Sequence, residues 1–160
     1  MIHRHFGKVP EVHQVGDDGQ ALMAQAKAKF STVGSAIERA AFREAVAELL
    51  SLSSAANQYI HQRAPWNQIK TDSDSDHAAE TLYVCAQVAN ALRVLAQPFV
   101  PFGSQAVRQF VQIRIPDAWE FSYLPAGTLV TEPAPVFTKI DPELVAAELK
   151  KLEELPSTPS

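Results

Sequence analysis

One segment near the middle of the chain reads Ala56-Asn57-Gln58-Tyr59-Ile60-His61-Gln62-Arg63-Ala64-Pro65-Trp66. Ile60 continues the apolar stripe of a helix, whereas Asn57 and His61 are four residues apart and therefore share one helical face. Pro65 disfavours helical geometry at the residue before it, so this helix is predicted to end just before Trp66. The segment thus predicts a rigid indole at a helix end, beside polar and basic side chains.

A flat aromatic ring in such surroundings suits an unpaired nucleic-acid base. Bases of single-stranded RNA stack on aromatic side chains while side chains or backbone groups read their edges. Each stacked base contributes roughly 1–3 kcal/mol, as judged by alanine substitution. The alternative is that Trp66 only packs against the foot of the fold, since tryptophan is highly buried on average. The residues alone leave both interpretations open.

Apolar residues recur at three- and four-residue spacings on either side of this segment, which predicts an all-α helical bundle. The predicted helices cover about 20–38, 42–63, 77–97 and 104–112, and a last one runs from Pro142 to about 155. Asp141 and Pro142 form a good helix start, and Ser104 is expected to cap the fourth helix. The stretch 115–139, rich in Pro, Gly and Thr, is expected to be extended, with room for short strands.

The first two helices have no strong cap between them, because residues 39–41 read Arg-Ala-Ala. A break is still expected there, since an uninterrupted helix over 20–63 would be far longer than the average helix of a globular domain. Asp17 and Asp18 sit where acidic residues favour a helix start.

Composition favours one folded domain and excludes several classes of protein. The chain has 160 residues, of which 46% are hydrophobic and 20% charged, so wholesale disorder is excluded. A formal charge of -4 excludes a uniformly basic nucleic-acid coat but not a local basic face. Residues 1–70 carry eight Lys and Arg against six Asp and Glu, whereas the remainder is acidic.

The single cysteine, Cys85, lies in an apolar stretch and is expected to be core packing. It excludes an intrachain disulfide and suits a reducing compartment. No apolar run reaches the ~18 residues of a membrane span, and the start lacks the apolar core of a signal peptide. We therefore expect a soluble, cytoplasmic protein.

Two groups of possible metal ligands fit solvated or capping roles better. The first is His3, His5 and His13, which lack a cysteine or acidic partner; the second is Asp72, Asp74 and Asp76. The aspartates alternate as in a calcium loop, but the glycine and closing glutamate of such a loop are missing. No Gly-x-Ser-x-Gly element occurs either. We expect no metal, no cofactor and no catalytic residue within this chain.

The segment 56–66 resembles the signature of the C-terminal, anticodon-binding helical domain of methionyl-tRNA synthetase. Further pieces agree in order and spacing: Phe6-Gly7-Lys8-Val9-Pro10, Leu92-Arg93, Pro98-Phe99-Val100-Pro101, and the stretch from Gly127 to Phe137-Thr138-Lys139-Ile140. The resemblance covers roughly residues 2–140. It predicts an anticodon-binding helical domain over 1–140, followed by a C-terminal helix and a tail or linker over 141–160.

The resemblance implies a class I aminoacyl-tRNA synthetase that joins methionine to its tRNA with ATP and Mg. In this family the helical domain recognises the CAU anticodon, and the tryptophan of the motif stacks on the first anticodon base. Carried over by position, Trp66 is the platform, Pro65 sets its orientation, and Asn57 and His61 are supporting contacts. The implied partners are methionine tRNA and the catalytic domain of the same enzyme, with no membrane and no DNA.

Three departures from the family pattern limit this implication. The His-Ile-Gly-His and Lys-Met-Ser-Lys-Ser segments of the catalytic half are missing, and the helix that carries two further polar anticodon contacts would precede Met1. His61 stands where the family often has an acid. We expect a fragment of a larger enzyme; the alternatives are a stand-alone tRNA-binding or assembly module without ligase activity, or a helical protein-interaction domain without an RNA partner.

Overall fold

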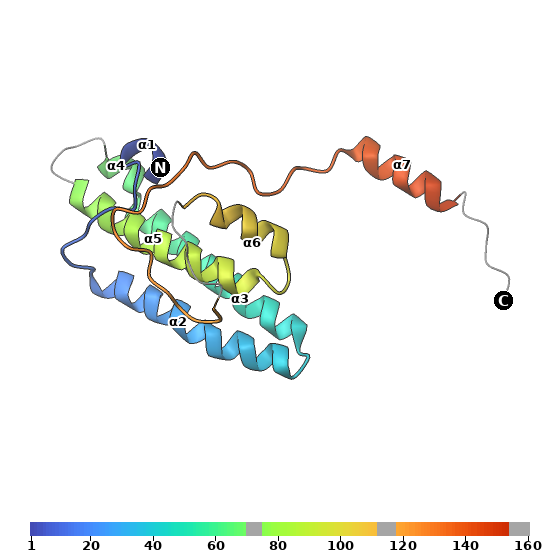
Figure 1. The fold of residues 1–160 in the computed structure, drawn as a ribbon, viewed down its shortest axis with the longest axis horizontal. Helices are drawn as coiled ribbons and strands as arrows, with labels where there is room; N and C mark the ends of the chain where they lie inside the picture. Colours follow the sequence, from blue (N-terminus) through green and yellow to red (C-terminus); the bar gives the residue numbers. More distant parts are fainter. Residues whose placement is uncertain (70–74, 112–117, 154–160) are drawn as a thin grey trace.

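Three long helices pack side by side in the computed structural model, which describes residues 1–69, 75–111 and 118–153 (Figure 1). They are α2 (Asp17–Glu38), α3 (Phe42–Arg63) and α5 (Ser75–Ala96), each of 22 residues. Their inward stripes meet in one core, whose members include Leu22, Phe30, Val33, Leu49, Leu52, Tyr59, Val84, Val88 and Leu95. The helical spacing of apolar residues thus produces the bundle, as expected of amphipathic helices.

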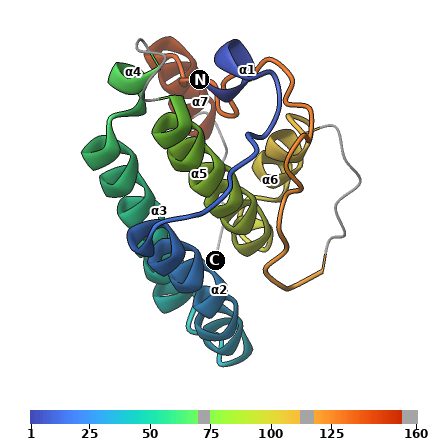
Figure 2. The ribbon, with the colours of Figure 1, turned by 90° about the vertical axis from the view of Figure 1, so that its left-hand side faces the viewer.

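Four shorter helices complete the described chain: α1 (Ile2–His5), α4 (Pro65–Gln68), α6 (Pro101–Arg108) and α7 (Pro142–Glu153). Figures 1 and 2 place α1 and α4 at the same end of the bundle, and α6 packs against α5. The described residues form no strand, and pair only in isolated bridges between Lys8 and Leu129 and between Val111 and Val130. The all-α prediction is confirmed.

The helix bounds agree with the sequence predictions at some ends and not at others. The second predicted helix has the bounds of α3, whereas the first helix begins three residues earlier, with Asp17 and Asp18 in its first turn. The predicted cap at Ser104 is wrong, because α6 already begins at Pro101. Proline at the first helical position starts a helix well, and the buried Ser104 hydroxyl instead donates to the Arg93 carbonyl at 2.8 Å.

The break between α2 and α3 is a Schellman motif built without glycine. Ala40 has φ 57°, and its N–H donates to the Ile37 carbonyl at 2.9 Å. The Ala41 N–H donates to the Ala36 carbonyl at 2.8 Å. These two bonds satisfy the last carbonyls of α2 and turn the chain into α3.

Polar side chains of α5 hold the extended segment that follows residue 118. The buried Gln87 donates to the Leu124 carbonyl at 3.0 Å and accepts the Leu124 N–H at 2.7 Å. Asn90 donates to the Ser122 carbonyl at 3.0 Å. The buried amides are therefore paired with backbone, as buried polar groups require. The described part of the predicted loop is extended, as expected.

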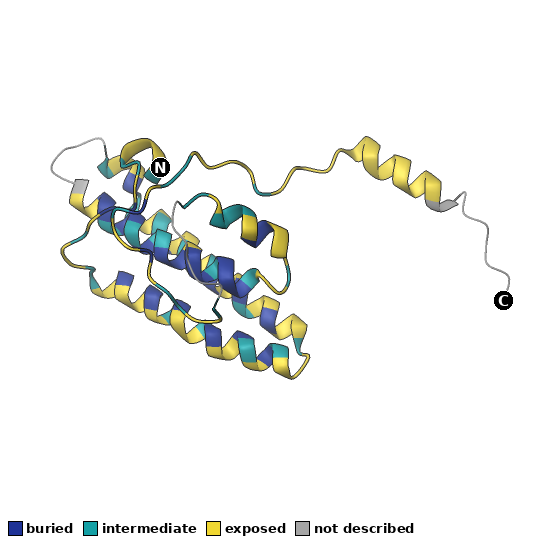
Figure 3. Ribbon diagram, in the orientation of Figure 1, coloured by how far each residue is buried: buried dark blue, intermediate teal, exposed yellow. Residues whose placement is uncertain are grey.

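The helix α7 projects away from the bundle (Figure 1), and residues 141–151 are all exposed (Figure 3). Its start agrees with the prediction, because the Asp141 carboxylate accepts the Glu143 N–H at 3.0 Å. Asp72 and Asp74 of the calcium-like pattern lie outside the described residues, and Asp76 is exposed. The predicted end of this helix near 155 also lies outside them.

Gly19 marks a close approach of the three long helices. A Cβ atom there would lie 2.7 Å from Val15 Cγ1, 3.0 Å from Val84 Cγ2 and 3.1 Å from the Tyr59 hydroxyl oxygen. Two of these neighbours belong to α3 and α5. No side chain larger than hydrogen fits without displacing one of them.

Candidate nucleic-acid interface

The indole of Trp66 is open to solvent at the end of α3. It belongs to the one-turn helix α4, and 39% of the residue is exposed, whereas Pro65 just before it is buried. The ring is therefore not enclosed in the core. Sequence reasoning placed the end of α3 correctly but missed α4, in which Pro65 occupies the first turn.

A left-handed turn at Ala64 connects the two helices. This residue has φ 42° and ψ 55°, and its N–H donates to the Ile60 carbonyl at 3.0 Å. Left-handed geometry is costly for a residue with a Cβ atom and persists where the surroundings determine it. The chain thus changes direction at Ala64, between α3 and the helix that carries Trp66.

His61 and Trp66 are in direct contact. Their rings meet edge to face, with centroids 5.7 Å apart and planes at 72°, a favoured geometry for aromatic pairs. Asn57 lies one turn earlier on α3, and both Asn57 and His61 are exposed. The structure therefore joins His61 to the indole and places Asn57 on the adjoining turn, with hydrogen-bonding groups free to meet a ligand.

An ion-pair cluster that sequence reasoning missed lies next to this turn. Arg63, the last residue of α3, donates to both Asp18 carboxylate oxygens, from Nε at 2.9 Å and from Nη2 at 2.6 Å. Its Nη2 also lies 3.4 Å from Glu80 Oε1. The same Glu80 oxygen accepts the Gly16 N–H at 2.9 Å. The cluster therefore joins the end of α3 to the beginnings of α2 and α5.

The protonation of this cluster follows from its contacts. Hydrogen bonding from Arg63 lowers the pKa of the Asp18 carboxyl. Burial raises the pKa of Tyr59 to about 12, and the Arg63 guanidinium lies 5.5 Å from the centre of that ring. At neutral pH Arg63 is thus a cation, Asp18 a carboxylate and Tyr59 a neutral phenol.

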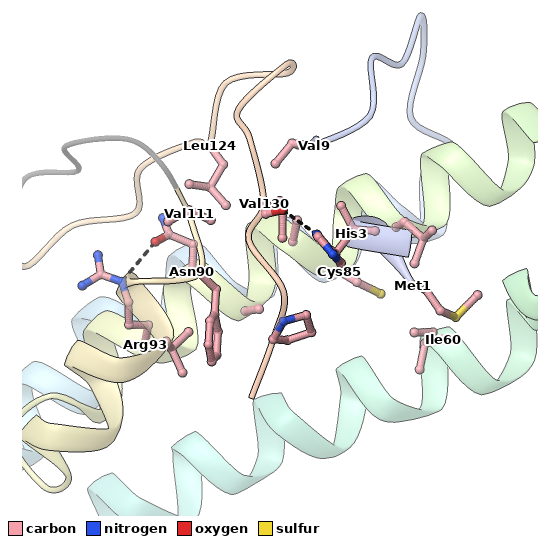
Figure 4. Close-up of a pocket in the computed structure, with 17 residues that line it drawn as sticks. Met1, His3, Val9, Ile60, Cys85, Asn90, Arg93, Val111, Leu124 and Val130 are labelled. Atoms are coloured by element: carbon pink, nitrogen blue, oxygen red, sulfur yellow. Dashed lines mark hydrogen bonds between the residues drawn. The ribbon is translucent and has the colours of Figure 1, made fainter. Parts of the chain in front are cut away.

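An apolar cavity of about 410 Å³ lies beside α5, between α1, α6 and the extended segment (Figure 4). Its apolar wall includes Ile60, Leu82, Cys85, Val107, Phe110 and Leu124. None of Asn57, His61, Pro65 and Trp66 lines it. Cys85 is packing, as predicted, and burial raises the pKa of its thiol to about 11.

Neither a metal cluster nor a membrane span is found in the described parts of the chain. No three His, Cys, Asp or Glu side chains there are grouped to hold a metal ion, and His3 instead bonds to the Val130 carbonyl at 2.9 Å. No helix among the same residues is long and apolar enough to cross a bilayer.

Comparison with known proteins identifies the family. The model of the anticodon binding domain of methionyl tRNA ligase matches residues 9–153. The chain belongs to this family. Among curated relatives, the methionine–tRNA ligase of Roseiflexus castenholzii is 29% identical over 181 residues, covering 95% of this chain and 30% of the relative. That of Flavobacterium psychrophilum is 31% identical over 152 residues, covering 92% of this chain and 22% of the relative.

Solved structures agree with the sequence relatives. The free methionyl-tRNA synthetase of Mycobacterium tuberculosis matches 89% of this chain with a TM-score of 0.81 and 25% identity, over 30% of its own length. The same enzyme bound by methionyl-adenylate matches 86% with a TM-score of 0.79 and 25% identity, over 28% of its length. The anticodon-binding domain spans about a third or less of each of these relatives. All are ligases, which gives the alternative of a module without ligase no support.

Proposed function

We propose that this anticodon-binding domain recognises the CAU anticodon of methionine tRNA by stacking its first base on Trp66. The observation that carries the proposal is the exposed indole at the end of α3, held edge to face by His61. An unstacked base covers the open face of such a ring, while polar groups nearby meet its edge. Pro65, buried beneath the turn, sets the orientation of the ring, and Asn57 and His61 supply the neighbouring polar contacts.

The chemical reaction belongs to the catalytic domain of the same enzyme, outside the 160 residues of this chain. There ATP, with Mg, activates methionine; a solved relative is bound by methionyl-adenylate. The role of the anticodon-binding domain is positional, because binding energy gained at the anticodon orients the tRNA so that its acceptor end reaches the active site. We assign this role to residues 1–140, treat 141–160 as a C-terminal helix with a tail or linker, and place the enzyme in the cytoplasm.

Titration of the full chain with a stem-loop RNA that carries CAU tests the proposal. We expect weak, salt-sensitive binding that prefers CAU over a scrambled loop. Trp66→Ala should reduce the binding free energy by ~1–3 kcal/mol, the worth of one stacked base. Trp66→Phe, which keeps a smaller platform, should lose less.

Phe102→Ala is the matched control. Phe102 is an aromatic residue on α6 that is 86% exposed, so its removal tests whether any exposed ring supports RNA binding. The Phe102→Ala variant should bind the CAU stem-loop as tightly as the unchanged chain does. Equal affinity for both loops, or equal affinity of Trp66→Ala and Phe102→Ala, would contradict the proposed function.

A further inference from the structure

We propose that Arg63, Asp18 and Glu80, here called the Arg63 clamp, position Trp66 for RNA by fixing the turn that presents it. The inference rests on the proposed function, because it assigns these residues a role in presenting the anticodon platform. None of the three is proposed to touch RNA. Their effect is exerted through the backbone of residues 63–66.

The clamp ties down the residue that precedes the turn. Arg63 binds both carboxylate oxygens of Asp18, from Nε and from Nη2, and this bidentate contact restricts orientation more than a single hydrogen bond does. Glu80 adds a contact from α5 and is itself held by the Gly16 N–H. The end of α3 is therefore attached to two other helices.

The residue that follows the turn is held as well. Pro65 is buried, and its carbonyl accepts the Ile69 N–H at 3.0 Å. Ala64 between these two anchors adopts the left-handed geometry that only glycine adopts at low cost. A strained residue keeps its conformation where its flanks are fixed. If Arg63 no longer holds the end of α3, the turn can relax and the indole can leave the orientation it has beside His61.

Removing the charge of Asp18 should change RNA affinity in opposite directions under the clamp proposal and under a purely electrostatic explanation. Asp18 carries a negative charge, and 56% of its side chain is exposed. Removing a negative charge from a surface near RNA strengthens binding if charge alone matters. It also frees Arg63 to meet a phosphate. Under the clamp proposal the same change weakens binding, so the two explanations predict opposite signs.

Asp18→Asn is therefore the decisive variant, and Asp17→Asn is its control. Both residues are acids in the first turn of α2, so each substitution removes one negative charge from the same helix end, although Asp18 alone also accepts the Gly19 N–H, at 2.9 Å. Asp17 takes no part in the clamp. We expect Asp18→Asn to bind the CAU stem-loop roughly fivefold more weakly than Asp17→Asn, a typical coupling within one ion-pair network.

Two further variants test whether the residues act as one unit. Arg63→Gln should weaken binding about as much as Asp18→Asn, and the double variant should be no weaker than Arg63→Gln alone. Arg63→Lys keeps the charge without the fork, so it should recover only part of the affinity. Unchanged far-UV circular dichroism confirms that each variant is folded.

Fluorescence reports the clamp without RNA. In a Trp119→Phe background Trp66 is the only tryptophan, and Asp18→Asn should change its quenching by acrylamide, whereas Asp17→Asn should not. Affinity of Asp18→Asn equal to or tighter than that of Asp17→Asn overturns the clamp. Identical quenching of the two variants also overturns it. Failure of the proposed function itself would give a different result. In that case the unchanged chain would not prefer the CAU loop, or the Trp66→Ala variant would bind as tightly as the unchanged chain.

Discussion

At the residue scale, the Trp66 ring is exposed to solvent, but its neighbours restrict its orientation. The indole is open to solvent, yet the His61 ring meets it edge to face and the residue before it, Pro65, is buried. A ring that is already oriented loses little conformational freedom when a base stacks on it. The contact with His61 is therefore expected to affect affinity through the orientation of the indole.

The edge contact leads to a prediction for His61. His61→Ala removes the ring and should weaken binding of the CAU stem-loop by about 0.5–1.5 kcal/mol, the worth of one aromatic pair. His61→Phe keeps an aromatic edge and should recover most of this loss if orientation is the cause. Titration of both variants at one salt concentration distinguishes the two roles. A His61→Phe variant as weak as His61→Ala would show that the imidazole acts by hydrogen bonding.

The sequence proposes Trp66 as the platform for a base, which stays a prediction, but it does not indicate which residues hold the turn before it. An aromatic residue after proline at the end of an amphipathic helix is visible in one short segment. The partners of Arg63 are not, because Asp18 lies 45 residues away and Glu80 lies on a third helix. Only the packing of α2, α3 and α5 brings these groups together.

At the element scale, two helices end in left-handed alanines. Ala40 lies two residues after the end of α2 and Ala64 directly follows α3, with φ of 57° and 42°. Both positions favour glycine, because a Cβ atom crowds the following carbonyl in this geometry. The chain thus carries the same backbone strain at opposite ends of α3, and only one of these turns lies beside Trp66.

Glycine at these positions should separate stability from recognition. Ala40→Gly and Ala64→Gly should each stabilise the fold by roughly 0.5–1 kcal/mol, since relief of strain exceeds the greater freedom of glycine in the unfolded chain. Urea unfolding with an unchanged slope measures this gain. Ala64→Gly should weaken RNA binding, whereas Ala40→Gly should not. Equal RNA affinity of the two variants would argue against a role of the strained turn.

Helix ends were the least predictable part of the fold. The long helices followed from periodicity over many residues, but α1 and α4 are four residues each, too short to show a repeat. The predicted start of α6 at Ser104 is wrong, because Pro101 occupies the first position of that helix. In the structure α5 already ends at Ala96, which leaves Pro101 free to begin the next helix.

At the scale of the whole molecule, the bundle and α7 differ in their attachment. The bundle shares one continuous core, and the extended segment is bonded to it through Gln87 and Asn90. By contrast, residues 141–151 are exposed throughout. The stability of the fold is therefore expected to reside in the part that ends before Asp141.

Truncation tests this division. A chain that ends at Ile140 should melt within about 1 °C of the full chain, because the removed side chains bury no core surface. A chain that ends at Val111 should melt much lower, since it loses buried Leu124 and leaves Gln87 without its backbone partner. Thermal unfolding by circular dichroism measures both. A drop of more than about 5 °C for the shorter deletion would mean that α7 contributes to the fold.

The close approach at Gly19 has a consequence for the platform end of the molecule. Gly19 directly follows Asp18 in the sequence. The distance between the axes of α2 and α3 at this point therefore determines whether the Asp18 carboxylate can reach the Arg63 guanidinium. A methyl group at position 19 would collide with Val84 and Tyr59 and increase the distance between the helices. The geometry of the proposed RNA-binding surface therefore depends on the lack of a Cβ atom at Gly19.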